Sequence, residues 1–203
     1  MSEMPNKHLM IDIETLDTKP GAAITAIGAV WFDPEDNAWR PTHRGFYVEV
    51  LLEDAMKYGT VSPSTLKFWM KQDDDARRFL TNDTGKVTLQ HALQSLDAFI
   101  GHQSKHRERR DVYVWGNCNK FDLGILEAMY DKLEMAYPWN YGRGQNVRTV
   151  VWMATELFGC EKPAMKPGRT AHNALDDAIH QAEYVTEMIR TIRGMPDDSV
   201  RAD

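Results

Sequence analysis

The chain has 203 residues, 42% of them hydrophobic, and a formal net charge of −6 at pH 7. That length suffices for one substantial core but not for two, so we expect a single domain over residues 1–203, with flexible tails at 1–7 and 195–203. The negative charge argues against a protein that holds nucleic acid through a broad basic surface. It still allows a nuclease whose acidic site is neutralised by metal ions.

The sequence has no apolar run long enough to span a membrane and no secretory signal at its N-terminus. We therefore expect a cytoplasmic protein with no membrane partner. Cys118 and Cys160 lie far apart, without the spacing of a zinc site or a disulfide scaffold. Both are expected to be small buried hydrophobic residues.

The first predicted strand is residues 8–15, HLMIDIET. Because side chains alternate along a strand, Asp12 and Glu14 lie side by side on the face opposite Leu9 and Ile11. Neighbouring carboxylates repel each other unless they share a proton or a cation, and oxygen ligands favour Mg²⁺ or Mn²⁺. The triplet D-x-E is common, however, and taken alone it is better explained by two solvated acids at a strand end.

Two further strands are predicted at residues 22–32 and 45–51, and they form a meander with the first strand. Short helices follow between residues 52 and 80. Here the apolar cluster FWM at 68–70, which includes Trp69, is expected to pack on the sheet. The alternatives are that an exposed member stacks on a base or that the cluster forms a dimer surface.

The middle of the chain alternates between helix and strand. An amphipathic helix at 88–101 precedes a buried strand at 111–115 and a helix at 123–135. Asp122 therefore lies between strand and helix, at the sheet edge where the first two acids are expected. The basic run at 105–110 is expected to be a solvated loop, with a phosphate-binding patch as the alternative.

Residues 138–145, PWNYGRGQ, are predicted to be a loop. Its aromatic and basic side chains either pack on the protein or grip single-stranded nucleic acid, and the sequence leaves both possibilities open. Residues 147–158 are predicted to begin as a short strand or turn and to lead into a helix.

The last informative stretch, residues 166–192, combines a glycine-containing loop with an amphipathic helix. His172 ends the loop, and Asn173 can cap the helix. Helical periodicity places Asp177 on the flank of the buried stripe and Asp176 toward solvent. A loop histidine with ordinary surface acids is the plainer interpretation of this segment alone.

Three segments together resemble the DEDDh group of DnaQ-like 3′-to-5′ exonucleases. DIET, with Asp12 and Glu14, is similar to the first motif of that family. GNCNKFD, ending in Asp122, is similar to the second, and the H-x(4)-D pair of His172 and Asp177 to the third. The motifs occur in the order found in the family and in the matching predicted elements.

The resemblance spans roughly residues 8–190. Within the family the chain looks most like the phage and prophage type, similar to the exonuclease A of T-even phages. The shared segments are WGN…FD, STLKFWMKQ and AHNALDDA.

The resemblance implies an α/β, ribonuclease H-like fold, with a mixed central sheet and helices on both faces. It implies a metal-dependent 3′-to-5′ exonuclease that releases nucleotides from the 3′ end of DNA, with single strands favoured. An exoribonuclease is the first alternative, and an inactive nucleic-acid-binding module the second. The apolar segment around Trp69, not the resemblance, is the candidate surface for a homodimer.

The expected mechanism uses two divalent ions, Mg²⁺ or Mn²⁺. Asp12, Glu14 and Asp177 are expected to hold the ion that activates water. Asp12 and Asp122 are expected to hold the ion near the leaving group. His172 is expected to take the proton of the attacking water, because an imidazole titrates near neutral pH.

Substrate contacts are expected from five side chains: Thr15, Trp69, Asn117, Asn119 and Phe121. Many family members have an asparagine four residues before the aspartate of the second motif, where this chain has Cys118. The two flanking asparagines, Asn117 and Asn119, are therefore both candidates for that contact.

Overall fold

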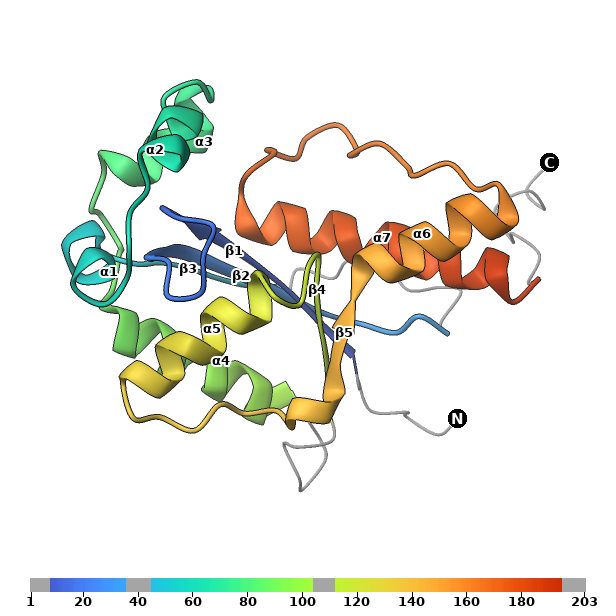
Figure 1. Cartoon of the computed structure of the whole chain (residues 1–203), viewed down its shortest axis with the longest axis horizontal. Coiled ribbons are helices and arrows are strands. Elements are labelled where there is room, and N and C mark those ends of the chain that lie inside the picture. Colours follow the sequence, from blue (N-terminus) through green and yellow to red (C-terminus); the bar gives the residue numbers. More distant parts are fainter. Residues whose placement is uncertain (1–7, 36–44, 104–111, 195–203) are drawn as a thin grey trace.

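The computed structural model describes residues 8–35, 45–103 and 112–194; the predicted tails and the basic run at 105–110 lie outside these residues. A five-stranded mixed sheet in the order β3-β2-β1-β4-β5 forms the centre of the molecule (Figure 1). Its strands are β1 (His8–Thr15), β2 (Ile24–Phe32), β3 (Phe46–Glu49), β4 (Tyr113–Gly116) and β5 (Gly144–Asn146).

The strand directions decide which sheet edge gathers the functional residues. Strand β2 pairs antiparallel with β1 and with β3, so the predicted meander is confirmed. Strand β4 pairs parallel with β1 and with β5. The carboxyl ends of β1, β4 and β5 therefore lie at the same edge of the sheet.

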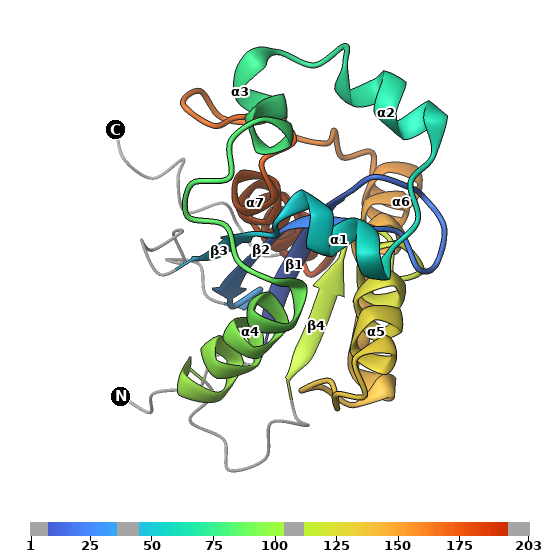
Figure 2. The ribbon, with the colours of Figure 1, turned by 90° about the vertical axis from the view of Figure 1, so that its left-hand side faces the viewer.

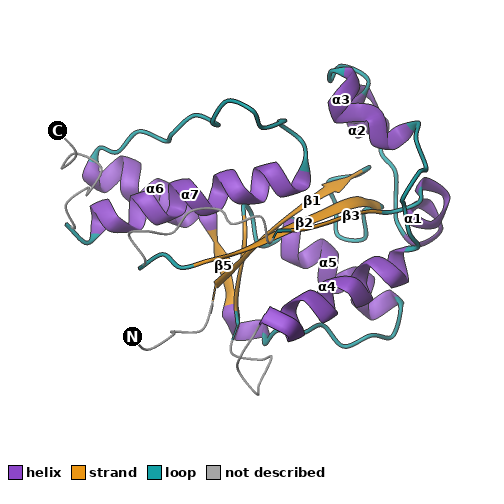
Figure 3. Ribbon diagram, turned by 180° about the vertical axis from the view of Figure 1, so that it is seen from behind, coloured by secondary structure: helices purple, strands orange, loops and turns teal. Residues whose placement is uncertain are grey.

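One face of the sheet is covered by α1 (Leu52–Tyr58), α4 (Leu89–Gln103) and α5 (Asp122–Lys132). Leu9 and Ile11 of β1 belong to the core cluster on this face, together with apolar side chains of all three helices. Figure 3 shows α4 and α5 side by side below the strands.

The opposite face is covered by α6 (Val147–Phe158) and α7 (Ala174–Ile192). Met10 of β1 packs here with Trp115 of β4, while Leu9 packs on the other face. The predicted alternation along β1 is thus confirmed, and so is the ribonuclease H-like arrangement of a mixed sheet with helices on both faces (Figures 1 and 3).

Helix α7 lies unusually close to the sheet at its first turn. Its stripe of small residues is buried, with Ala174, Ala178 and Ala182 all fully covered. On β2, a Cβ added to Gly28 would lie 2.2 Å from the backbone of Ala174. Gly28 is the register partner of Asp12, so this close approach brings the start of α7 beside the acidic end of β1.

Three short helices lie beyond the end of β1: α2 (Pro63–Trp69), α3 (Asp74–Arg77) and η1 (Arg78–Leu80) (Figure 2). Ser62 caps α2 by accepting a hydrogen bond from the backbone N–H of Thr65 at 3.1 Å. The indole N–H of Trp69 donates to the carbonyl oxygen of Thr15 at 2.9 Å. This bond attaches α2 to the end of β1.

The structure corrects the prediction for residues 138–158. The expected loop contains the helical turn η3 (Tyr141–Arg143) and the edge strand β5, which is too short and polar to show a hydrophobic alternation. Residues 147–158 form helix throughout, because Asn146 caps α6 by accepting from the N–H of Arg148 at 3.0 Å. Trp139 is buried at 3% exposure in the core, so it packs on the protein.

Within the described residues, none of the helices combines the length and the apolar character needed to cross a bilayer. Cys118 and Cys160 are half-buried thiols that form no disulfide.

Candidate active site

The side chains predicted to be catalytic meet in one pocket at the sheet edge where β1, β4 and β5 end. The pocket has a volume of about 660 Å³. All five line it: Asp12, Glu14, Asp122, His172 and Asp177. This edge is where open α/β sheets commonly bind ligands.

Strand β1 places two acids in the pocket. Asp12 and Glu14 alternate with the apolar residues that face α4 and α5, and each is 9% exposed. The following hydroxyl, of Thr15, donates to the carbonyl oxygen of Asp17 at 2.6 Å. Two neighbouring carboxylates at this depth are costly unless a proton or a cation compensates their charge.

The third acid, Asp122, is the first residue of α5 and is 2% exposed. Its Oδ2 accepts a hydrogen bond from the backbone N–H of Cys118 at 2.8 Å. A Cβ added to Gly116, the last residue of β4, would lie 2.8 Å from the Asp122 Cβ and 2.9 Å from its Oδ2. The glycine of GNCNKFD therefore leaves room for this carboxyl group.

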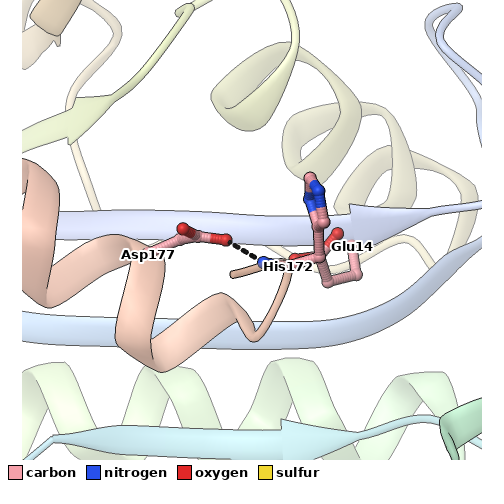
Figure 4. Close-up of side chains that lie close together, drawn as sticks. All are labelled: Glu14, His172 and Asp177. Atoms are coloured by element: carbon pink, nitrogen blue, oxygen red, sulfur yellow. Dashed lines mark hydrogen bonds between the residues drawn. The ribbon is translucent and has the colours of Figure 1, made fainter. Parts of the chain in front are cut away.

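His172 and Asp177 enter the pocket from the start of α7. Asn173 caps the helix as predicted, by accepting from the N–H groups of Leu175 and Asp176. The backbone N–H of His172 donates to Asp177 Oδ2 at 2.8 Å (Figure 4). His172 has a left-handed backbone with φ of 64°, which few residues other than glycine adopt.

Among the described residues, Glu14, His172 and Asp177 offer ligand atoms that all lie within 4.8 Å of one another (Figure 4). Asp12 and Asp122 add two more carboxylates to the same pocket. Carboxylate oxygens are the preferred ligands of Mg²⁺ and Mn²⁺, and one imidazole is compatible with them. The donor set therefore fits divalent cations.

Burial raises the pKa of every acid in the pocket. The pKa of Asp12 lies well above its usual range through burial and then through the charges of Asp122 and Asp177. Burial, followed by the charge of Asp12, likewise raises the pKa of Glu14. Burial raises the pKa of Asp122 to about 6 and that of Asp177 in the same direction. Bound cations would favour the ionised forms that burial disfavours.

Gln181 is a site residue that the sequence analysis missed. It is 6% exposed, and its Nε2 donates to Asp12 Oδ1 at 2.7 Å. This bond lowers the pKa of Asp12, although burial outweighs it. Gln181 follows Asp177 by four residues on α7, and this spacing could have placed it on the same helix face.

Four of the five predicted substrate contacts line the pocket: Thr15, Trp69, Asn117 and Phe121. Asn119 does not line it, and its side-chain oxygen is buried with no hydrogen-bond partner among the described residues. Of the two asparagines that flank Cys118, the structure thus brings Asn117 to the site.

The apolar cluster at 68–70 divides between core and pocket. Trp69 lines the pocket but is only 1% exposed, so little of its ring is available to a base. Phe68 is 41% exposed and also lines the pocket, with its ring centroid 5.0 Å from that of His172 in an edge-to-face contact. Successive helical residues face different directions, and here the exposed aromatic ring at the site is that of Phe68.

Asp176 is half-buried, whereas the periodicity of the helix predicted a solvated side chain. Its Oδ2 accepts a hydrogen bond from the backbone N–H of Thr170 at 2.9 Å. The preceding loop folds back over the first turn of α7, which helical periodicity could not reveal.

Three basic side chains that the sequence analysis did not connect with the site also line the pocket: Arg148, Lys162 and His180. Arg148 lies just after β5. Because β5 was not predicted, the sequence did not show that Arg148 lies at the sheet edge that holds the site. Lys162 lies in the long loop between α6 and α7 and had no local pattern to identify it (Figure 1).

Comparison with solved structures shows several nucleases with this fold. Cell-death related nuclease 4 (CRN-4) aligns with a TM-score of 0.61 and 16% identity over 92% of this chain, which spans 64% of the length of that protein. The nuclease domain of 3′hExo, a DEDDh family member bound to rAMP, aligns with a TM-score of 0.58 and 12% identity over 94% of both chains.

E. coli ExoI, in the metal-free form of its complex with single-stranded DNA, aligns with a TM-score of 0.55 and 13% identity over 92% of this chain and 39% of its own. Identities this low establish a shared fold. None of the curated proteins compared with the sequence matches it significantly.

A family model settles the relationship at the level of sequence. The model described as the 3′-5′ exoribonuclease Rv2179c-like domain matches residues 7–189, which include all three motifs. The chain therefore belongs to the family of 3′-5′ exoribonuclease Rv2179c-like domains, and its enzyme class is that of the 3′-to-5′ exonucleases.

Proposed function

We propose that the chain hydrolyses single-stranded RNA from its 3′ end, one nucleotide at a time, with the help of two divalent ions, Mg²⁺ or Mn²⁺. The observation that carries this proposal is the meeting of four carboxyl groups and one imidazole in a single pocket of a chain from this family.

The residues divide the work as follows. Asp12, Glu14 and Asp177 would hold one ion, and Asp12 and Asp122 would hold the other. Bound divalent ions would make water a better nucleophile and would offset the negative charge that develops on the phosphate. Asp12 and Asp122 are largely buried, and electrostatic interactions are stronger where less water screens them.

His172 accepts the proton of the attacking water at an imidazole nitrogen. Its position in the loop before α7 places the ring against Phe68 and its backbone N–H on Asp177. General-base catalysis by a positioned side chain contributes about 10²- to 10⁴-fold to a rate.

One observation favours RNA as substrate. The family model that covers the chain is described as that of an exoribonuclease, so we propose RNA ahead of DNA, the opposite of the order expected from the motifs. The preference for single strands is carried over from the sequence. The phage and prophage type, a homodimer and a cytoplasmic location remain predictions from the sequence.

Digestion of matched oligonucleotides tests the proposal. We expect 5′-labelled single-stranded RNA to shorten from its 3′ end in Mg²⁺ or Mn²⁺, faster than DNA of the same sequence and faster than duplex RNA. EDTA should abolish the ladder.

The matched control is Asp12→Ala, which removes a carboxylate shared by both proposed ions and should show no ladder. Faster digestion of DNA than of RNA would mean that DNA is the preferred substrate. Folded protein that binds RNA and divalent metal but cleaves neither nucleic acid would instead indicate an inactive binding module.

A further inference from the structure

A strand of nucleic acid must approach a pocket that holds four acidic side chains, on a protein with a net charge of −6. Every phosphate of that strand carries a negative charge. Metal ions can offset the negative charge of the acids near the cleaved phosphate. The neighbouring phosphates would be bound by cationic side chains of the protein.

Two cationic side chains line the pocket, Arg148 at the start of α6 and Lys162 in the loop that follows α6. Both residues are exposed to solvent. The charge of Arg148 lowers the pKa of Asp122, and that of Lys162 lowers the pKa of Asp177. The two cations therefore lie in the electrostatic field of the catalytic acids.

Neither cation is paired with a carboxylate in the described part of the chain. The guanidinium group of Arg148 makes no hydrogen bond or ion pair there. The ammonium group of Lys162 lies 4.6 Å from the ring centroid of Tyr184, a side chain that is 1% exposed and also lines the pocket. This cation–π contact positions Lys162 without neutralising its charge.

The other cations of the same loop are different. Lys166 and Arg169 both bind Glu183 on α7, at 3.1 Å and 2.6 Å. Their charge is largely compensated within the protein, and neither side chain lines the pocket. Arg148 and Lys162 thus stand apart as solvent-exposed cations in the pocket lining that pair with no carboxylate of the described residues.

We propose that Arg148 and Lys162 form a phosphate-binding wall that holds backbone phosphates next to the cleaved one. The proposal rests on the exonuclease function and adds a binding subsite to it. The planar guanidinium of Arg148 can donate two hydrogen bonds to one phosphate, whereas Lys162 acts as a point charge. Neither contact reads the base, so the wall orients the strand without selecting its sequence.

The salt dependence of binding tests the wall, because each phosphate contact releases counterions. The probe is a fluorescent single-stranded oligoribonucleotide, and its binding to the His172→Ala protein, which is expected to cleave slowly, is measured in Mg²⁺ by anisotropy over a range of salt concentrations. Adding Arg148→Gln or Lys162→Gln should each weaken binding roughly fivefold at low salt and reduce the slope of log K against log salt by about 0.7.

The matched control is Lys166→Gln, which removes the same formal charge from the same loop but from a residue paired with Glu183. It should leave the salt slope unchanged. In the otherwise wild-type enzyme, the Arg148 and Lys162 substitutions should raise KM for RNA while kcat stays within about twofold, since the wall contributes to binding more than to chemistry.

The outcomes separate this proposal from the function on which it rests. If wild-type protein degrades RNA but both substitutions leave the salt slope unchanged, the wall is overturned and the exonuclease stands. If the slopes fall while no cleavage occurs, the wall stands and the catalytic proposal is wrong. Absence of both binding and cleavage would overturn both.

Discussion

His172 combines two features that make it sensitive to substitution. Its ring makes edge-to-face contacts with Phe68 and Trp69, at centroid distances of 5.0 Å and 6.0 Å. Its backbone is left-handed and donates to Asp177. The aromatic contacts limit the orientations of the imidazole, while the half-exposed position leaves it accessible from the pocket.

Replacing His172 separates its proposed role as a base from a role as a metal ligand. We expect His172→Ala to lower kcat by about 10²- to 10⁴-fold, because the proton of the attacking water loses its acceptor. Calorimetric titration with Mn²⁺ should give nearly the wild-type affinity, since the four carboxylates remain. A loss of Mn²⁺ affinity as large as the loss of kcat would mean that His172 is a metal ligand.

The control is His91→Ala, at an exposed histidine of α4 that does not line the pocket. It should keep wild-type turnover and Mn²⁺ affinity.

At the scale of elements, the site depends on how closely α7 lies against β2. Gly28 of β2 pairs with Asp12 of β1 and faces the backbone of Ala174. The first turn of α7 carries Asp177 and follows His172. How closely Ala174 approaches Gly28 therefore sets the distance of these two residues from Asp12.

Gly28→Ala should therefore damage both stability and activity. The added Cβ would lie 2.2 Å from the carbonyl carbon of Ala174, and backbone cannot give way as a flexible side chain can. We expect a loss of about 3 kcal/mol in the free energy of unfolding. Urea denaturation measures this loss, and turnover of the folded fraction should fall as well.

Gly124→Ala in α5 is the comparison, because its added Cβ would meet no atom closer than 3.6 Å. That substitution should stabilise the protein by roughly 0.5 to 1 kcal/mol, as alanine favours helix over glycine. Equal effects of the two substitutions would mean that Gly28 is not a steric requirement.

At the scale of the whole molecule, the active site works against folding when no cation is bound. Burial raises the pKa of Asp12, Glu14, Asp122 and Asp177. An acid with a raised pKa in the folded state favours unfolding once it ionises. The free-energy cost of ionising such an acid is absent at low pH. It develops as the pH rises from the pKa of the acid in the unfolded state to its pKa in the folded state.

The cost of ionising Asp122, including its repulsion with Asp12 and Glu14, can be measured by substitution, because burial raises its pKa from an ordinary 3.8 to about 6. In EDTA, the free energy of unfolding of the wild-type protein should fall by on the order of 3 kcal/mol relative to that of Asp122→Asn between about pH 4 and pH 6.5. The asparagine cannot ionise and can still accept the hydrogen bond from Cys118. Urea unfolding of both proteins across this range measures the difference.

Addition of Mg²⁺ at neutral pH should restore stability to the wild-type protein more than to Asp122→Asn, because a cation favours the ionised carboxylate. The comparison between the two proteins removes the opposite contribution of Glu183, whose burial raises its pKa less than its bonds to Arg169 and Lys166 together lower it. Parallel pH profiles of the two proteins would contradict the buried, costly carboxylate at Asp122.

The sequence determined the features that depend on neighbours along the chain. Alternation in HLMIDIET placed Asp12 and Glu14 on one face, and the structure has them there. Asn173 caps α7, as its position in the sequence predicted. Asp122 is the first residue of the helix that follows β4. Strand pleating, helical periodicity and capping all act over a few residues, so a local pattern is sufficient to predict them.

Only the tertiary structure decided which side chains meet across the sheet edge. Gln181 bonds to Asp12 across 169 residues of chain, and Arg148 reaches the pocket because β5 pairs with β4. Trp69 is covered while Phe68 is exposed because α2 packs over the end of β1. Such contacts follow from the packing of distant elements, whose free energy is shared over many residues and leaves no local pattern in the sequence.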